Sequence, residues 1–163
     1  MNASSNTVEP HPQVVADAAT ARAAVRLSSE YFLRSARLMT ETTQGDLMKA
    51  VVLRAILAAN IGHLDQNPNV AAQFSGVDSP PPDDLRRPVS VLSVAGSLGL
   101  PFETTRRYVN KLIREGRCVR VKGGVLAPAA TLDSPEQEQA LLLNLANLRR
   151  LFRGLKRAGV DLE

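Results

Sequence analysis

The sequence is poor in aromatic residues and in cysteine. Phe and Tyr make up 4% of the 163 residues, Trp is absent, and Cys118 is the only cysteine. One cysteine excludes a disulfide framework and a cysteine-based zinc site within one chain, and it is typical of a protein in a reducing compartment. With so few aromatic residues, the core must consist of Leu, Val, Ile and Ala, which favours packed helices over a β-sandwich.

Long uninterrupted hydrophobic runs are also absent. The most apolar stretch, residues 47–64, contains Lys49, Arg54, Asn60 and His63, so it is too polar to be expected to span a bilayer. The first residues lack the charged and then apolar pattern of a secretion signal. These absences predict a cytoplasmic protein with no membrane partner.

Patterns of enzyme chemistry are missing as well. The sequence has no phosphate-binding glycine loop, no nucleophile with a matched base and no metal-ligand spacing. His63 has only His11 as a second histidine, and Asp83 and Asp84 are neighbours in an expected loop. We expect no catalytic residues, no cofactor and no metal site, and we expect Cys118 to be a small buried residue rather than a redox sensor.

The residue pattern that is present predicts a mainly α-helical chain with one short β-hairpin. Residues 67–88 form a Pro-rich loop in this prediction, because five of the ten prolines lie in or next to it. The other expected regions are a disordered tail (1–16), N-terminal helices for dimerisation or the core (17–66), a helix-turn-helix with a hairpin (89–130) and a C-terminal helix (134–159).

Residues 89–130 carry the most informative pattern. Ser90 can cap a short helix, Gly99 supplies a tight turn, and Gly116 ends a second helix expected over residues 101–115. A strand-like alternation follows, and Gly123-Gly124 turns it back as a hairpin over residues 117–127. A short helix, a turn, a longer helix and a hairpin are the layout of a winged helix-turn-helix, which usually places its second helix in the DNA major groove.

The positive charge of the chain gathers in the same region. Residues 85–124 hold nine Lys or Arg and two Asp or Glu, so their net charge is +7, whereas the whole chain has a net charge of +4. A basic segment that coincides with a helix-turn-helix favours an anionic partner such as double-stranded DNA.

The outer face of the expected second helix supplies the candidate DNA-binding residues. Arg106 and Arg107 are placed to pair with guanine edges and Asn110 with an adenine edge. Glu103 either accepts a hydrogen bond from cytosine or caps the helix. Lys111, Arg114 and Lys122 are expected at phosphates, as are Arg86 and Arg87. The full candidate set is Phe102, Glu103, Thr104, Arg106, Arg107, Asn110, Lys111, Arg114, Arg120 and Lys122.

The segment Leu98-Gly99-Leu100 and the run from Thr104 to Gly116 resemble the recognition segment of bacterial winged helix-turn-helix transcriptional regulators, in the broad MarR/GntR-like group. The resemblance implies a homodimer that binds a pseudo-palindromic operator, with the hairpin on the backbone or in the minor groove. The short hairpin and the loop at 67–88 depart from the MarR-like pattern. The alternative is a winged-helix module that binds another protein.

The C-terminal helix carries a heptad-like seam of Leu141, Leu145, Leu148, Phe152 and Leu155. Such a seam serves a dimer contact or packs on the chain's own helix at residues 47–64. A small-molecule effector has no support in the sequence, and any pocket for one is expected between the N-terminal helices and the DNA-binding region.

Overall fold

The computed structural model describes the backbone of residues 12–161 and the side chains of residues 18–161. It is mainly helical, with one two-stranded antiparallel sheet, as the sequence predicts. The chain forms two compact units. We call residues 36–144 the central unit. The described residues of the other unit, 12–35 and 145–161, form what we call the two-helix unit.

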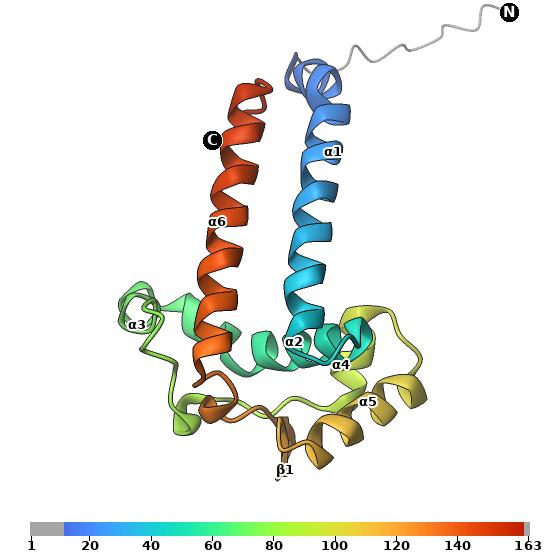
Figure 1. Ribbon diagram of the computed structural model, residues 1–163, viewed down its shortest axis with the longest axis vertical. Coiled ribbons are helices and arrows are strands. Elements are labelled where there is room, and N and C mark those ends of the chain that lie inside the picture. The colour runs from blue at the N-terminus through green and yellow to red at the C-terminus, as the bar shows by residue number, and fades with distance from the viewer. Residues whose placement is uncertain (1–11, 162–163) are drawn as a thin grey trace, which may run out of the picture. The chain divides into compact units, whose positions relative to one another are not determined.

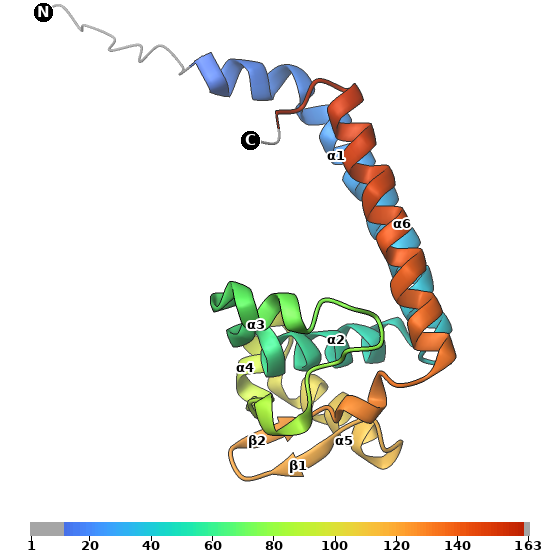
Figure 2. The same ribbon diagram turned by 90° about the vertical axis from the view of Figure 1, so that its left-hand side faces the viewer.

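The α-helices, in chain order, are α1 (Pro12–Glu41), α2 (Leu47–Ile61), α3 (Pro68–Gln73), α4 (Val91–Leu98), α5 (Phe102–Arg114) and α6 (Pro135–Arg157). Three 3-10 turns lie at Gly62–Gln66, Asp83–Leu85 and Ala129–Thr131, and the strands are β1 (Val119–Val121) and β2 (Gly124–Leu126). Figures 1 and 2 show these elements.

Local signals in the sequence explain where most helices begin and end. The Asp46 carboxylate accepts a hydrogen bond from the Lys49 backbone N–H and caps α2, and the Ser90 hydroxyl caps α4 in the same way. Gly99 has a φ of 62°, which provides the left-handed turn between α4 and α5. These three predicted signals are confirmed.

Three predicted boundaries need correction. Residues 12–16, expected in the tail, already belong to α1, because no Gly or Pro after Pro12 interrupts the helical sequence there; residues 1–11 of that tail lie outside the described residues. Pro101 caps α5 rather than forming its first residue. The Pro-rich loop contains α3, whose N-cap Asn67 accepts from the N–H groups of Asn69 and Val70.

The core of the central unit lies where α2 meets α4, α5 and β2. Val52, Ile56, Val109 and Leu112 are fully buried there, and no residue of the predicted seam on α6 belongs to this cluster. Residues 47–66 are the one described segment that has the length and composition to cross a membrane. The central turns of this segment are buried in the core, as in a core helix of a soluble protein.

The hairpin is joined to the rest of the central unit through its second strand. Val119 pairs with Leu126 and Val121 pairs with Gly124, while Val125 forms an additional antiparallel bridge with Val89. A Cβ added to Gly124 would lie 2.3 Å from the Val89 carbonyl oxygen. Only glycine therefore allows the hairpin to approach the segment before α4 this closely. Figure 2 shows both strands next to α5.

In the two-helix unit, α1 and α6 run side by side and antiparallel in both views (Figures 1 and 2). Their close contact is at Gly154, which is buried and where an added Cβ would lie 3.0 Å from a methyl group of Leu27. The small residue at this position lets the two backbones approach each other.

Candidate functional site

Helix α5 has one fully buried face and one exposed face. Thr105, Val109 and Leu112 are fully buried, and the Thr105 hydroxyl donates to the Pro101 carbonyl oxygen at 3.3 Å. The predicted inner face is thus confirmed for these residues. Because α5 is fixed through this face, its opposite face points in a defined direction.

The first turn of α5 presents an acid and two arginines. The Arg106 guanidinium donates through Nε to both oxygens of the Glu103 carboxylate, at 2.8 and 3.0 Å, and a further contact joins the Arg106 Nη2 to Glu103. This pairing lowers the pKa of Glu103 and raises that of Arg106. The Arg107 side chain is exposed and makes no hydrogen bond or ion pair with another described residue, although its charge also lowers the pKa of Glu103. Of these two neighbouring arginines, Arg106 is therefore paired with a carboxylate, whereas the Arg107 side chain is not.

The β-hairpin reaches α5 through a side-chain hydrogen bond. Arg120 on β1 donates from Nη2 to the Asn110 side-chain oxygen at 2.7 Å. Asn110 is half-buried, and Arg120 is exposed. The two predicted site residues thus meet at one place, between the middle of α5 and the first strand.

The C-terminal half of α5 is tied to the start of α2 by two ion pairs. Lys111 Nζ lies 2.8 Å from the Asp46 carboxylate, and Lys49 Nζ lies 2.9 Å from the Glu115 carboxylate. Chiefly because of the hydrogen bond from Lys111, the pKa of Asp46 is lowered. The Lys111 ammonium, which the sequence places at a phosphate, is therefore already engaged with a carboxylate of its own chain.

The remaining predicted side chains of this surface are exposed at separate positions. Arg114 lies at the end of α5, Lys122 at the hairpin turn, and Phe102 at the start of α5 with 47% of its surface exposed. Thr104 is half-buried beside them. The exposed face of α5 and the hairpin together form what we call the α5–hairpin surface.

The expectation that Arg86 contacts a phosphate is wrong. The Arg86 side chain is completely buried and donates to the carbonyl oxygens of Pro81 and Ala127 at 2.9 to 3.1 Å, with Asp83 3.4 Å away. Its desolvation lowers the pKa of the guanidinium. Arg86 therefore anchors the Pro-rich segment to the end of the hairpin. Arg87, one residue further on, is exposed.

Asn60 is a structural residue that the sequence analysis passed over as a polar interruption in an apolar helix. Its side chain is fully buried, donates to the carbonyls of Arg87 and Val125, and accepts from the Ala127 N–H at 2.9 Å. The side-chain amide of Asn60 thus links three parts of the chain: α2, β2 and the segment that precedes α4. A lone Asn in an apolar helix face was the available signal, because buried amides must find partners.

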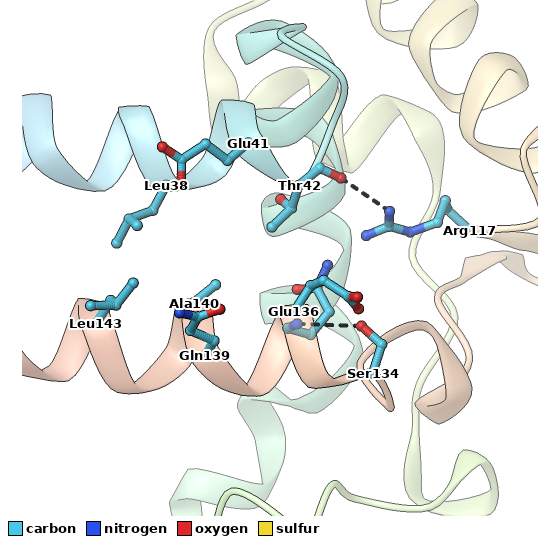
Figure 3. Close-up of a pocket in the computed structure, with 10 residues that line it drawn as sticks. Leu38, Glu41, Thr42, Arg117, Ser134, Glu136, Gln139, Ala140 and Leu143 are labelled. Carbon is cyan, nitrogen blue, oxygen red and sulfur yellow. Dashed lines mark hydrogen bonds between the residues drawn. The ribbon is translucent and has the colours of Figure 1, made fainter.

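A cavity of about 450 Å³ lies in the central unit between the end of α1 and the start of α6. Figure 3 shows Leu38 and Leu143 at one end and Arg117 at the other, where Arg117 donates to the Thr42 carbonyl oxygen at 3.3 Å. Glu41 and Glu136 also line it. Any effector pocket was expected between the N-terminal helices and the DNA-binding region, but Arg117 is the one lining residue of this cavity that belongs to residues 89–130.

Comparison of the chain with family models, with curated proteins and with solved structures gave no match. The chemistry of the α5–hairpin surface follows from its own residues. The surface offers guanidinium and ammonium groups with hydrogen-bond donors, on a helix that is fixed by its buried face. Within the part of the chain that the structure describes, no group of three or more His, Cys, Asp or Glu side chains could hold a metal ion.

Proposed function

We propose that this protein is a sequence-specific double-stranded DNA-binding transcriptional regulator with a winged helix-turn-helix. Helix α5 is the recognition helix for the major groove, and the β1–β2 hairpin is the wing on the backbone or in the minor groove. The observation that carries the proposal is the division of α5. Thr105, Val109 and Leu112 are fully buried, while Glu103, Arg106 and Arg107 are exposed on the first two turns.

The side chains at the start of α5 match what base reading requires. Arg107 is free to donate both of its terminal nitrogens to a guanine edge, and such a bidentate pair contributes roughly 1–3 kcal/mol of discrimination. Arg106 is oriented by Glu103, so the pair presents a donor and an acceptor side by side. The bond between Arg120 and Asn110 would hold the wing in register with α5.

The two-helix unit supports a homodimer. Val25 and Phe32 on α1 are 64% and 58% exposed, and Leu145 and Phe152 on α6 are 43% and 53% exposed. Each pair is seven residues apart, so each marks a seam along one side of its helix. Soluble monomers seldom expose contiguous rows of large apolar side chains. The seam predicted on α6 therefore includes side chains available to a second copy.

Both seams lie on the outer sides of the helix pair. Two residues correspond to about 200° of helical rotation, so Val25, two residues before Leu27, and Phe152, two residues before Gly154, each point away from the contact between the helices. Either seam is therefore open to a second copy, and a homodimer fits a pseudo-palindromic operator.

Binding to genomic fragments tests the proposal. The full-length protein is mixed with sheared genomic DNA, bound fragments are recovered, and the enriched sequence is measured by gel shift against a random duplex. We expect Arg106→Ala/Arg107→Ala to weaken binding to the enriched sequence by roughly 10- to 100-fold, from the discrimination that a bidentate pair provides. Arg37→Gln/Arg54→Gln, which removes two exposed charges elsewhere, is the matched control and should bind as the wild type does.

A protein-binding module is the second candidate, favoured by exposed apolar side chains near the same helices. Leu92 on α4 is 69% exposed, and Phe102 is 47% exposed. If no sequence is enriched and Arg106→Ala/Arg107→Ala binds DNA as the control does, the recognition role of α5 is excluded and this candidate takes its place.

A further inference from the structure

A second basic surface lies on α6, outside the helix-turn-helix. Its five cationic side chains occupy nine residues, and no Asp or Glu occurs between residues 139 and 160. The five are exposed, and four of them line a shallow hollow of about 380 Å³. The cations are Arg149, Arg150, Arg153, Lys156 and Arg157. We call them the α6 basic surface.

The five residues share one sector of the helix. Their spacing of one, three or four residues keeps them on one side of α6, beside the contact of Gly154 with Leu27. Between residues 145 and 158 this sector holds no acid and, apart from the cations, only Ala146. The side chains therefore form a continuous positive strip without an apolar patch inside it.

Favourable interaction with the helix dipole accounts for only part of this arrangement. Cations in the last turn are stabilised modestly by the dipole, but this stabilisation falls off beyond that turn. Lys156 and Arg157 are in the last turn, whereas Arg149 and Arg150 lie two turns before the end of α6. Like charges three and four residues apart repel each other, so the strip costs stability unless an anion covers it.

The charge of the whole unit agrees with this interpretation. The described residues of the two-helix unit carry eight Lys or Arg and three Asp or Glu, whereas the central unit carries twelve and eleven. The two-helix unit therefore has a net charge of +5 and the central unit +1. The sequence analysis missed this because acids at positions 133–138 and 161–163 cancel the basic strip when the C-terminal region is summed.

The geometry points to a second nucleic-acid contact: the α6 basic surface binds the phosphate backbone of nucleic acid, without reading its bases. Four of the five cations are arginines, whose planar forks match phosphate oxygens. Five charges along about 12 Å of rigid helix suit a partner with a dense row of negative charge. An anionic membrane would need large apolar side chains among the cations for insertion, whereas the one uncharged side chain in this sector between residues 145 and 158 is that of Ala146.

This inference goes beyond the proposed function and does not depend on base reading by α5. The apolar seam of Leu145 and Phe152 borders the basic strip, because Arg149 lies four residues after Leu145 and Lys156 lies four residues after Phe152. Each copy in a dimer would carry one such strip.

The test uses the full-length chain in the Arg106→Ala/Arg107→Ala background, which removes the proposed base readers, and a fluorescent duplex of random sequence. Binding is measured between 50 and 200 mM salt. We expect Arg150→Gln/Arg153→Gln to lower the slope of log K against log salt by about 1.8, and to weaken binding roughly 60-fold at 0.1 M salt. Arg37→Gln/Arg54→Gln in the same background is the charge-matched control and should leave the slope unchanged.

The inference is overturned if the α6 variant and the control bind the random duplex with the same slope. It is also overturned if the α6 variant loses binding to vesicles containing phosphatidylserine while its DNA binding is unchanged, since the partner is then a lipid surface. Loss of operator preference in Arg106→Ala/Arg107→Ala is measured separately on the enriched sequence. Failure of the proposed function is therefore distinguishable from failure of this inference.

Discussion

The ammonium group of Lys49 lies 2.9 Å from the carboxylate of Glu115, and only 3% of the lysine side chain is exposed. The pair joins the first turn of α2 to the residue that caps the C-terminus of α5. A lysine buried to this extent must be neutralised, because an unpaired ammonium would lose its hydration without compensation. The orientation of α5 therefore depends on a carboxylate at its end.

Glu115→Gln should destabilise the protein by about 1–3 kcal/mol, since it leaves a buried ammonium facing a neutral amide. The expected loss of stability is smaller than for a fully buried ion pair, because the Glu115 side chain is 34% exposed. Urea unfolding followed by circular dichroism measures the change. Glu103→Gln, which breaks an exposed pair, should have a much smaller effect on stability, and equal losses for the two variants would contradict a special role for Lys49.

The ion pair between Asp46 and Lys111 should make stability depend on pH. The pKa of Asp46 is lowered in the folded protein, so its contribution is present above the ordinary carboxyl pKa of 3.8 and is lost as the pH falls through the folded value. The pKa of Lys111 is raised, so the contribution of that group is complete below its ordinary pKa of 10.5 and is lost at more alkaline pH.

Asp46→Asn isolates this effect, because Asn still caps a helix well but carries no charge. Thermal unfolding between pH 3 and pH 7 should show a smaller loss of stability on acidification for Asp46→Asn than for the wild type. Asp46→Ala, which removes the cap and the charge together, should be less stable than Asp46→Asn at neutral pH. The ion-pair explanation fails if the wild type and Asp46→Asn show the same pH dependence.

Much of the fold could be predicted because its signals are local. Ser90, Gly99 and the pattern of Thr105, Val109 and Leu112 each act within a few residues of the chain, through capping, a positive φ and helical periodicity. Local signals of the same kind also predicted the helical character of the chain and the exposed face of α5.

The remaining features depend on contacts between residues far apart in the sequence. Arg86 and Arg87 are equivalent in the sequence, yet Arg86 turns inward to the carbonyls of Pro81 and Ala127. The residues near position 86 carry no signal that the Ala127 carbonyl will lie within hydrogen-bond distance of Arg86. Lys111 likewise has the spacing of a phosphate-binding residue, but Asp46, 65 residues earlier, occupies its ammonium group.

Gly124→Ala should detach the hairpin from the segment before α4. The new Cβ would lie 2.3 Å from the Val89 carbonyl oxygen and 2.6 Å from its carbon, and the φ of 149° adds strain. Overpacking and backbone strain together should cost about 3 kcal/mol. Gly123→Ala is the matched control, because its nearest foreign atom is 3.9 Å away and only the strain of its φ remains.

Hydrogen exchange measured at the Val125 amide, which donates to Val89, follows the detachment directly. Exchange at this amide should be faster in Gly124→Ala than in Gly123→Ala. Unchanged protection in Gly124→Ala would show that the close approach to Val89 is not needed for the hairpin to dock.

Cys118 should be unreactive in the folded protein. Only 1% of the residue is exposed, and burial raises the pKa of its thiol to about 11. Since the thiolate is the reactive form, a maleimide at pH 7.5 should not label the native chain, and labelling should become complete in urea. An exposed thiol introduced by Ser28→Cys serves as the control that must react at once. Rapid single-site labelling of the wild type would contradict the buried position of Cys118.

The exposed seams on the two-helix unit should control self-association. Phe32→Glu and Phe152→Glu place charges on α1 and α6, at side chains that are 58% and 53% exposed in the single chain. Neither change should destabilise the isolated chain by more than about 0.5 kcal/mol, because surface substitutions away from buried contacts have small effects. Within a dimer interface, however, each charge would be buried without a partner, so both variants should sediment as monomers at concentrations where the wild type is dimeric.

Leu33→Glu is the control, since Leu33 is 66% exposed but lies on a different side of α1 from Phe32. A wild type that sediments as a monomer, or a control that dissociates as fully as the two Phe variants, would rule out these seams as a dimer interface.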